Sequence, residues 1–529
     1  MKWLFLLAFP SLLSTCRQAA EANNFGKASG NNGLRDAATY YIDPAGNDNN
    51  TGLNPAEPWK SLRKLSAITF VAGDSILLKS GGVWDETIQL KGSGKMDAYI
   101  VLDKYGGEKK PVINGGGKQN GSSTLLLQKG SYWKISNLEI TNKVPDGLTY
   151  AATGIRINGG GRQDDFCTNI TVSNCYVHDV NAATAKQPNY IKGTGGIILN
   201  GKLSDVLVQS CHIAQCSVEA LRTTGFSEMS DRSKNIVFDN NLIENIYGDG
   251  IVMSQVSGGS RVTNNTVYNA CMTNDINFAG IWTVVSKNTI VSHNEVYGMK
   301  GGGPNDGMAF DADGWDEQSA TDGDIFEYNY SHDNNGGFFL FMSHANNITV
   351  RYNVSVNDVG PTGAKKLFLI ENSPKTDRYI YNNVFYIKNP VSLLFWKGAG
   401  ALFSNNIFFT ESTIDRLADV TLDERARFYN NCFYPASAFS GLDWGQAVRK
   451  DNFYTDPQFL NPISGKGFEA PQGFGIKESS PCRNAGITID NNGGRDFAGS
   501  PLPKGLPDVG AFQYTVISQA GSSLNKSQK

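Results

Sequence analysis

The sequence predicts an all-β protein, namely a right-handed parallel β-helix of about ten or more rungs with three strands per rung. Two observations support this prediction. A strand–turn–strand unit recurs with an Asn or a Cys at its turn, and a further short strand, usually opened by Gly, follows each unit. Coiled-coil heptads, long helical patterns and alternating strand–helix spacing are absent. We expect an N-terminal cap before the rungs and a C-terminal end segment after them.

The first 37 residues are predicted to be a leader and a tether. Lys2 supplies a positive charge, and the apolar stretch from Trp3 to Leu13 is too short to span a bilayer. The segment Leu13-Ser14-Thr15-Cys16 resembles a bacterial lipobox, in which the Cys is lipidated; an ordinary cleaved signal is the alternative. We therefore expect a signal peptide over 1–16, lipidation at Cys16 and a flexible tether over 17–37. The protein would then be secreted and lipid-anchored at the bacterial cell surface or in the periplasm.

The rest of the chain is predicted to be one repeat domain with its two ends. We expect the N-terminal cap and first rungs over 38–110, the parallel β-helix over 111–435, the end segment over 436–515 and a tail over 516–529. Net charge is -3 and no basic stripe is present, which argues against a nucleic-acid partner. Apart from Cys16, seven scattered cysteines are expected to be buried thiols. With five histidines and no CxxC pair, no metal site is predicted.

The turn position of the recurring unit is the clearest repeat. Its spacing runs from 23 residues (383 to 406) to 36 residues (175 to 211), shorter than the roughly 40 or more residues of a propeller blade. Asn tolerates the left-handed conformation of a sharp bend, and amides stacked rung above rung can hydrogen-bond as a ladder. We expect one edge of the helix to stack Asn241, Asn265, Asn294, Asn329 and Asn353.

The Gly-led strands form the third element of each rung. They begin at Gly154, Gly196, Gly250, Gly280, Gly307 and Gly337, with Ala220, Lys366 and Ser392 at the equivalent position of other rungs. Apolar and polar residues alternate along them, so one face of each strand is buried and the other faces outward.

The order of strand, Asn turn, strand, loop and Gly-led strand resembles the pectate-lyase superfamily. The segments YYIDPAGNDNNTGLNPAEPWKSLRKL and GDSILLKSGGVW are similar to the cap of secreted bacterial β-helix enzymes, and SSPCRNAGITIDNNGGRDFAGSPLPKGLPDVGAFQY resembles their end segment. The resemblance covers nearly all of residues 38–515. It implies a carbohydrate-active enzyme that binds a polysaccharide or oligosaccharide on the outer face of the Gly-led strands, as a monomer.

Candidate site residues follow from the alternation of these strands. With Ile251 and Met253 pointing inward, the same register turns Asp311 and Asp313 outward, with Cα atoms about 6.5 Å apart. Two such carboxylates raise one another's pKa and can divide the roles of acid and base in glycosidic hydrolysis. The predicted catalytic residues are Asp311, Asp313, Asp306 and Asp249, and the predicted substrate-binding residues are Arg222, Trp282, Phe339, Glu219 and Glu371.

Three functions are consistent with this pattern. An extracellular glycoside hydrolase without a required cofactor is the first. A polysaccharide lyase is the second, with Arg222 or Lys300 as base and Ca²⁺ held by Asp249, Asp306 and Asp311. The calcium-dependent pectate lyases of family nine fit less well, because Asp311 stands where they have their base lysine and NNGGFFLF in the next rung lacks their paired Asp. This departure does not exclude a lyase that uses Arg222 or Lys300. A noncatalytic glycan-binding β-helix is the third.

Overall fold

The computed structural model describes residues 35–145, 148, 151–181, 192–273, 278–301, 306–360, 365–372, 377–398 and 400–515. The expected lipobox with Cys16, the tether up to residue 34 and the tail over 516–529 lie outside the described residues. The chain divides into Met1–Asp36 and Ala37–Lys529, and every strand belongs to the second unit. Among the described residues, no helix is long and apolar enough to cross a membrane.

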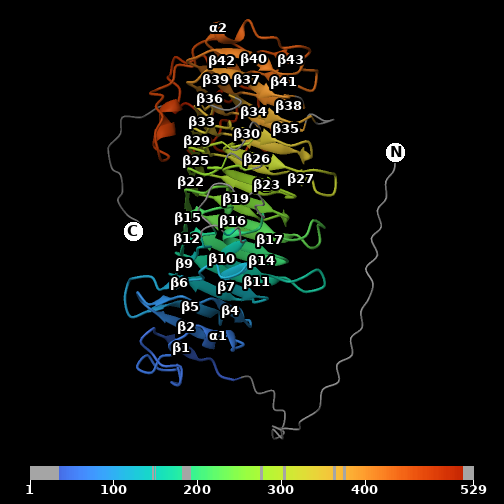
Figure 1. Cartoon of the computed structure of the whole chain (residues 1–529). Helices are drawn as coiled ribbons and strands as arrows, with labels where there is room; N and C mark the ends of the chain where they lie inside the picture. Colours follow the sequence, from blue (N-terminus) through green and yellow to red (C-terminus); the bar gives the residue numbers. More distant parts are fainter. Residues whose placement is uncertain are drawn as a thin grey trace. The chain divides into compact units, whose positions relative to one another are not determined.

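Three long parallel sheets run the length of the second unit, and their strands follow one another in chain order from β1 in blue to β43 in orange-red (Figure 1). The chain visits the sheets in turn, so each rung contributes one strand to each sheet. This arrangement confirms the predicted parallel β-helix.

The first sheet has 16 strands, and β20 pairs with β17 beside the main path. In stacking order its strands are β1 (Thr39–Ile42), β2 (Ser75–Lys79), β5 (Ile100–Tyr105), β8 (Trp133–Ser136), β11 (Cys167–Ser173), β14 (Leu203–Gln209), β17 (Ser233–Asp239) with β20 (Val256–Ser257), β21 (Arg261–Thr263), β24 (Ile290–Ser292), β28 (Ile325–Glu327), β32 (Ile348–Arg351), β35 (Arg378–Tyr381), β38 (Ala401–Ser404), β41 (Arg427–Tyr429) and β43 (Val448–Lys450).

The second sheet has 12 strands and contains the Gly-led strands. Its strands are β4 (Ile88–Lys91), β7 (Ser122–Gln128), β10 (Ala152–Asn158), β13 (Gly195–Asn200), β16 (Glu219–Thr224), β19 (Asp249–Ser254), β23 (Ile281–Val284), β26 (Phe310–Asp313), β30 (Phe339–Phe341), β34 (Lys366–Ile370), β37 (Val391–Trp396) and β40 (Ile414–Ala418).

The third sheet has 13 strands, and β27 (Thr321–Asp322) and β31 (Ala345–Asn346) form a separate pair. The strands of the third sheet are β3 (Val83–Trp84), β6 (Val112–Asn114), β9 (Glu139–Asn142), β12 (Tyr176–Val180), β15 (His212–Cys216), β18 (Leu242–Glu244), β22 (Thr266–Tyr268), β25 (Glu295–Tyr297), β29 (Tyr330–His332), β33 (Val354–Val356), β36 (Val384–Ile387), β39 (Ile407–Thr410) and β42 (Cys432–Tyr434). The helices are α1 (Arg63–Ser66), α2 (Ala436–Phe439) and the 3-10 helix η1 (Ala470–Phe474).

The interior is filled by columns of inward side chains that stack from rung to rung. In the second sheet one column consists of Ile281, Phe310, Phe339, Phe368 and Phe395, all buried in the main core. Burying an aliphatic or aromatic side chain of this size stabilises the fold by about 1.5–3 kcal/mol. The seven cysteines among the described residues are free and buried, so they pack as small apolar side chains.

The predicted asparagine ladder is present along one edge. The Asn241 amide donates to the Asn265 side-chain oxygen at 2.9 Å, and the Asn265 amide donates to that of Asn294 at 2.9 Å. The same bond continues rung by rung through Asn329, Asn353, Asn383, Asn406, Asn431 and Asn452. Asn452 is a member that the repeat pattern alone did not identify.

The left-handed bend does not lie at the ladder asparagine, as the sequence analysis expected. It lies one residue earlier, where Asn240, Asn264 and His293 have φ values of 53°, 56° and 55°. Because the ladder residue must turn its amide into the buried stack, the residue before it takes the strained conformation. Tyr328 and Tyr352 show that this preceding position is not restricted to Asn.

The glycines that open the third strand meet a close approach between rungs. A Cβ atom at Gly250 would lie 2.4 Å from the Gly280 carbonyl oxygen and 2.5 Å from a methyl carbon of Val267. A side chain at this corner would push the rungs apart, which accounts for the recurrence of Gly there.

Candidate active site

The outer face of the second sheet carries a straight column of residues, one from each rung. Parallel register pairs Arg222 with Val252, Val252 with Trp282, and Trp282 with Asp311. The column continues through Leu340, Leu369 and Trp396. Asp313 ends β26 on the same face, paired with Val284. The second sheet therefore brings predicted site residues from several rungs onto one surface.

Asp311 is the most strongly perturbed carboxylate of this face. Its side chain is 8% exposed, and its Oδ1 atom has no hydrogen-bond partner among the described residues. Burial raises its pKa well above the usual range, and the negative charges of Asp313, Asp306 and Asp249 add to the rise, whereas Lys192 opposes it. Asp311 is therefore held in its protonated form more strongly than an ordinary carboxyl group.

Asp313 and Asp306 are more open to solvent than Asp311, since both are only partly buried. Burial also raises the pKa of Asp313, but the backbone N–H of Gly314 donates to its carboxylate and Lys192 lies nearby, and both favour the ionised form. Asp306 precedes β26, and its charge raises the pKa of both other carboxyl groups. The three acids thus form one electrostatically coupled group.

Glu219 and Asp249 are paired in register on the neighbouring strands β16 and β19, and both are fully buried. The Glu219 carboxylate accepts hydrogen bonds from Arg222 and, at 2.6 Å, from the backbone N–H of Gly193. The expectation that Glu219 contacts substrate is therefore wrong for this structure. Both of its oxygens are occupied by these hydrogen bonds.

Asp249 also lies beneath this surface rather than on it. Its Oδ1 atom accepts a hydrogen bond from the Ala279 N–H at 2.9 Å, and its Oδ2 atom lies 3.6 Å from the Lys192 ammonium nitrogen. Burial raises its pKa to about 7, with Lys192 lowering and Glu219 raising it. A carboxyl group with no exposed surface cannot reach a sugar, so the predicted catalytic role of Asp249 is replaced by an electrostatic one.

Trp282 faces outward as predicted but offers no open platform. It is 5% exposed, and the Lys192 ammonium nitrogen lies 4.3 Å from its ring centroid, with the Arg222 guanidinium at 5.7 Å. The two cations cover the ring, so Trp282 supports them through cation–π contacts. Arg222 itself is 8% exposed and is held by Glu219, which leaves it little surface for a substrate contact.

The expected outward orientation of Phe339 is wrong. Phe339 is fully buried in the core, and Leu340 takes the outward position opposite Asp311. The inward residue follows Gly280 by one position (Ile281) but follows Gly337 by two (Phe339). A shift of one residue exchanges the two faces of a strand, which reversed the expected orientation.

A small cavity of about 130 Å³ joins Asp306 to Glu371. Its remaining lining is Leu340, Met342, Leu369, Trp396 and Lys397. The Glu371 carboxylate is paired with Lys397 at 2.5 Å. The predicted catalytic residue Asp306 and the predicted substrate-binding residue Glu371 thus line the same cavity, beside several apolar side chains.

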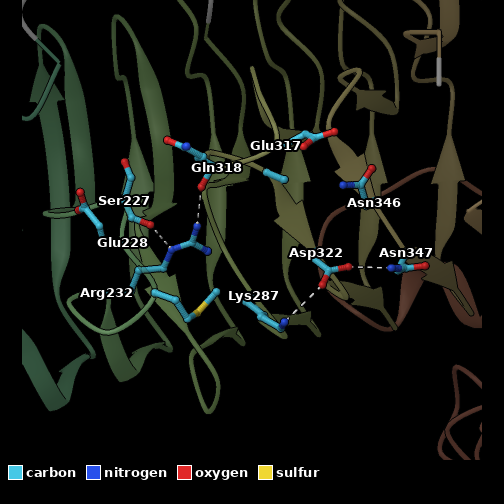
Figure 2. Close-up of a pocket in the computed structure, with 11 residues that line it drawn as sticks. Ser227, Glu228, Arg232, Lys287, Glu317, Gln318, Asp322, Asn346 and Asn347 are labelled. Carbon is cyan, nitrogen blue, oxygen red and sulfur yellow. Dashed lines mark hydrogen bonds and ion pairs between the residues drawn. The ribbon is translucent and has the colours of Figure 1, made fainter. Parts of the chain in front are cut away.

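A further cavity, of about 740 Å³, is partly walled by the loop that follows Asp313. Figure 2 shows Arg232 donating to the carbonyl oxygens of Ser227 at 2.9 Å and Gln318 at 3.2 Å, which ties this loop to the one before β17. Lys287 and Asn347 both contact the Asp322 carboxylate (Figure 2). Lys287 and Asp322 form an ion pair, Arg232 is bound to backbone carbonyls, and Glu228 is paired with Arg162, so most charged groups of this cavity already have partners, unlike Asp311.

No group of three or more His, Cys, Asp or Glu side chains is arranged to hold a metal ion in the part of the chain that the structure describes. The calcium site of the lyase alternative stays a prediction for experiment. Lys300, its other candidate base, is exposed.

Known proteins share this architecture. Residues 117–296 match a family model described as "Right handed beta helix region". The crystal structure of a lacto-N-biosidase of glycoside hydrolase family 136 from Eubacterium ramulus superposes with a TM-score of 0.57 and 25% identity, over 66% of this chain and 64% of that one. The chain is a right-handed parallel β-helix protein. It is related to carbohydrate-active enzymes.

The crystal structure of the selenomethionine derivative of the Eubacterium ramulus protein gives a TM-score of 0.55 and 24% identity over the same shares of both chains. The β-helix protein is also 26% identical to a lacto-N-biosidase from Bifidobacterium longum subsp. longum, over 91% of this chain and 36% of the relative. It thus spans about a third of the length of that curated relative and less than two thirds of the crystallised one.

Two lysines of the β-helix protein lie at the site although the repeat pattern does not point to them. Lys192 influences the pKa of Asp249, Asp311 and Asp313 from the loop before β13, outside any repeat position. Lys366 opens β34 and is 1% exposed; burial lowers its pKa to about 8, and the charge of Asp306 opposes this. Lys366 occupies the position that Gly holds in most other rungs, and this replacement of Gly by a lysine is the one sequence feature that could have identified it.

Proposed function

We propose that the protein is an extracellular glycoside hydrolase that uses the carboxyl groups around β26 as acid and base. The observation that supports this most directly is the coupled group of Asp306, Asp311 and Asp313 on the outer face, in which one carboxyl is strongly biased toward its protonated form. Glycosidic cleavage requires a protonated carboxyl and an ionised one on either side of the scissile bond.

The environments of the acids support the following division of roles. Asp311, which burial and three neighbouring charges keep protonated, donates its proton to the glycosidic oxygen as the C–O bond breaks. Asp313, which receives a hydrogen bond from Gly314 and is more exposed, acts as the ionised carboxylate that activates water or attacks the anomeric carbon. Asp306 maintains the proton on Asp311 through its charge. No cofactor is needed for these steps.

The substrate in this proposal is an oligosaccharide or polysaccharide. The two relatives are named as lacto-N-biosidases, which makes that activity the first to assay. The hollow beside Asp306, with Trp396 and Leu369 in its lining, is suited to the apolar face of a sugar ring. We place the enzyme at the bacterial cell surface or in the periplasm, as a secreted monomer anchored through Cys16.

A polysaccharide lyase is the second candidate, favoured by one observation. Two cations, Lys192 and Arg222, lie beside the buried acids, and a lyase needs a cation near the uronate carboxylate. Both cations, however, already contact the Trp282 ring and pair with carboxylates of the protein itself, so neither is free to bind a uronate carboxylate.

The deciding experiment is a glycan screen that includes lacto-N-biosidase substrates, with product analysis. If the protein is a hydrolase, it should release reducing sugars without unsaturated uronate ends, and it should do so even when a chelator is present. Asp311→Asn should lower kcat by several orders of magnitude. Asp316→Asn is the matched control, because Asp316 is exposed in the following loop and bonds Ser319. Products with unsaturated uronate ends, together with loss of activity on chelation, would establish a calcium-dependent lyase. Binding without turnover would establish a glycan-binding protein.

A further inference from the structure

A cavity of about 380 Å³ lies far along the helix on the outer face of the first sheet, away from the β26 carboxylates on the second sheet. We call it the tyrosine cavity. Its floor consists of side chains from β28, β32, β35 and β38, among them Tyr379 and Leu402, which are paired in register and only partly buried. The C-terminal segment 487–491 contributes the opposite wall.

Both ends of this wall are fastened to the sheet. The Ile487 N–H donates to the Asn405 side-chain oxygen at 2.9 Å, and the Asn405 amide donates back to the Ile487 carbonyl at 2.9 Å. At the other end Arg351 donates to the Asn491 carbonyl at 2.5 Å. Because the wall is held at both ends, the tyrosine cavity exists before any ligand arrives, which lowers the cost of binding.

The one positive charge in the lining of the tyrosine cavity, that of Arg351, is already neutralised. Arg351 lies in the lining, but its Nε and Nη2 atoms contact the Glu327 carboxylate at 2.7 and 2.6 Å, and Nη1 also bonds the Tyr381 hydroxyl at 3.1 Å. A free anion would therefore gain little from Arg351. The exposed Asp490 carboxylate in the lining also repels an anion, so the cavity favours a ligand without negative charge.

One polar group in the lining has no partner. Ser404 is 2% exposed, and its hydroxyl oxygen forms no hydrogen bond among the described residues. This oxygen has almost no exposed surface, so the polar groups that a ligand can reach lie at the opposite wall. Asp490 and Asn491 add polar groups at the opposite wall, while Tyr379 and Ile489 pack against the tyrosine cluster formed by Tyr328, Tyr352 and Tyr381.

We propose that the tyrosine cavity is a second saccharide-binding site, separate from the catalytic face. A sugar is uncharged and combines one apolar face with several hydroxyls, as this lining requires, and the volume lies within the range of about 300–1,000 Å³ for small-ligand sites. The choice of a saccharide over another neutral ring compound rests on the proposed function. A glycan held there remains close to the enzyme between cleavage events.

The test measures binding of lacto-N-biose and methyl β-galactoside by calorimetric titration of the full chain carrying Asp311→Asn, which prevents hydrolysis. Tyr379→Ala removes the floor, and Leu402→Trp fills the space. Tyr429→Ala is the matched control, because Tyr429 is a partly buried tyrosine of the same sheet, paired with Ser404 but outside the cavity lining. Thermal unfolding of each variant checks that the fold is retained.

We expect Tyr379→Ala and Leu402→Trp each to weaken one class of binding sites at least tenfold and Tyr429→Ala to leave it unchanged. In the chain with Asp311 intact, all three substitutions should keep kcat on a short soluble substrate within twofold. Binding that is equal in all variants, or no saccharide binding at all, overturns the second site. Absence of hydrolysis together with Tyr379-dependent binding overturns only the proposed function.

Discussion

The Lys192 ammonium nitrogen lies 3.6 Å from the Asp249 carboxylate and 4.3 Å from the centroid of the Trp282 ring. Burial raises the pKa of Asp249, Asp311 and Asp313, and the charge of Lys192 opposes the rise in all three. Lys192 is thus a positioning residue. From a loop it lowers the pKa of three carboxyl groups that stand on strands or beside them.

Removal of that charge should move the pH profile of hydrolysis. In Lys192→Met the pKa of both Asp311 and Asp313 rises. The proton donor then stays protonated to higher pH, and the ionised carboxylate forms only at higher pH, so both limbs of the profile move upward by about one unit. Lys192→Arg, which keeps the charge, should leave the limbs in place. An unchanged profile in Lys192→Met would contradict the electrostatic role.

The asparagine ladder should contribute strongly to stability. Asn294→Ala removes the acceptor for the Asn265 backbone N–H at 3.0 Å and for its amide at 2.9 Å, and it leaves the Val262 carbonyl without its donor. We expect the free energy of unfolding to fall by at least about 3 kcal/mol, measured by denaturant titration. Asn49→Ala, at an exposed position of the N-terminal segment, should change it by less than about 0.5 kcal/mol. Equal effects of the two substitutions would mean that the ladder is not a stabilising element.

The two faces of β30 should separate stability from catalysis. Phe339→Ala creates a cavity in the core and should cost about 3–5 kcal/mol of unfolding free energy. Leu340→Ala alters the apolar lining beside Asp306 and should mainly raise KM for the oligosaccharide. Paired thermal melts and steady-state kinetics check both. A large increase in KM for Phe339→Ala, with unchanged stability, would instead indicate that Phe339 points outward.

Lipid attachment at Cys16 is a separate prediction, supported by the apolar run that ends in Leu-Ser-Thr-Cys. A fatty-acid analogue fed to expressing cells should label the intact chain and not Cys16→Ser. The unlabelled variant should also leave the membrane fraction. Labelling of both chains, or of neither, would show that the leader is processed without lipid.

Local periodicity was sufficient to predict the rungs, the ladder and the face on which the acids lie. Each rung repeats the same short alternation, so the pattern that places Val252 outward also places Trp282 and Asp311 outward. The ladder followed in the same way, because a buried amide stack needs one Asn per rung at a fixed turn.

The sequence by itself therefore determined the architecture and the group Asp306, Asp311 and Asp313. Only the tertiary structure decided which of the neighbouring residues are reachable. Phe339 turned inward because one extra residue follows Gly337, and Glu219 and Asp249 are covered by loops whose course no repeat dictates. Lys192 entered the site from such a loop. Burial and charge pairing depend on contacts between rungs and loops distant in the chain, and these contacts leave no periodic trace in the sequence.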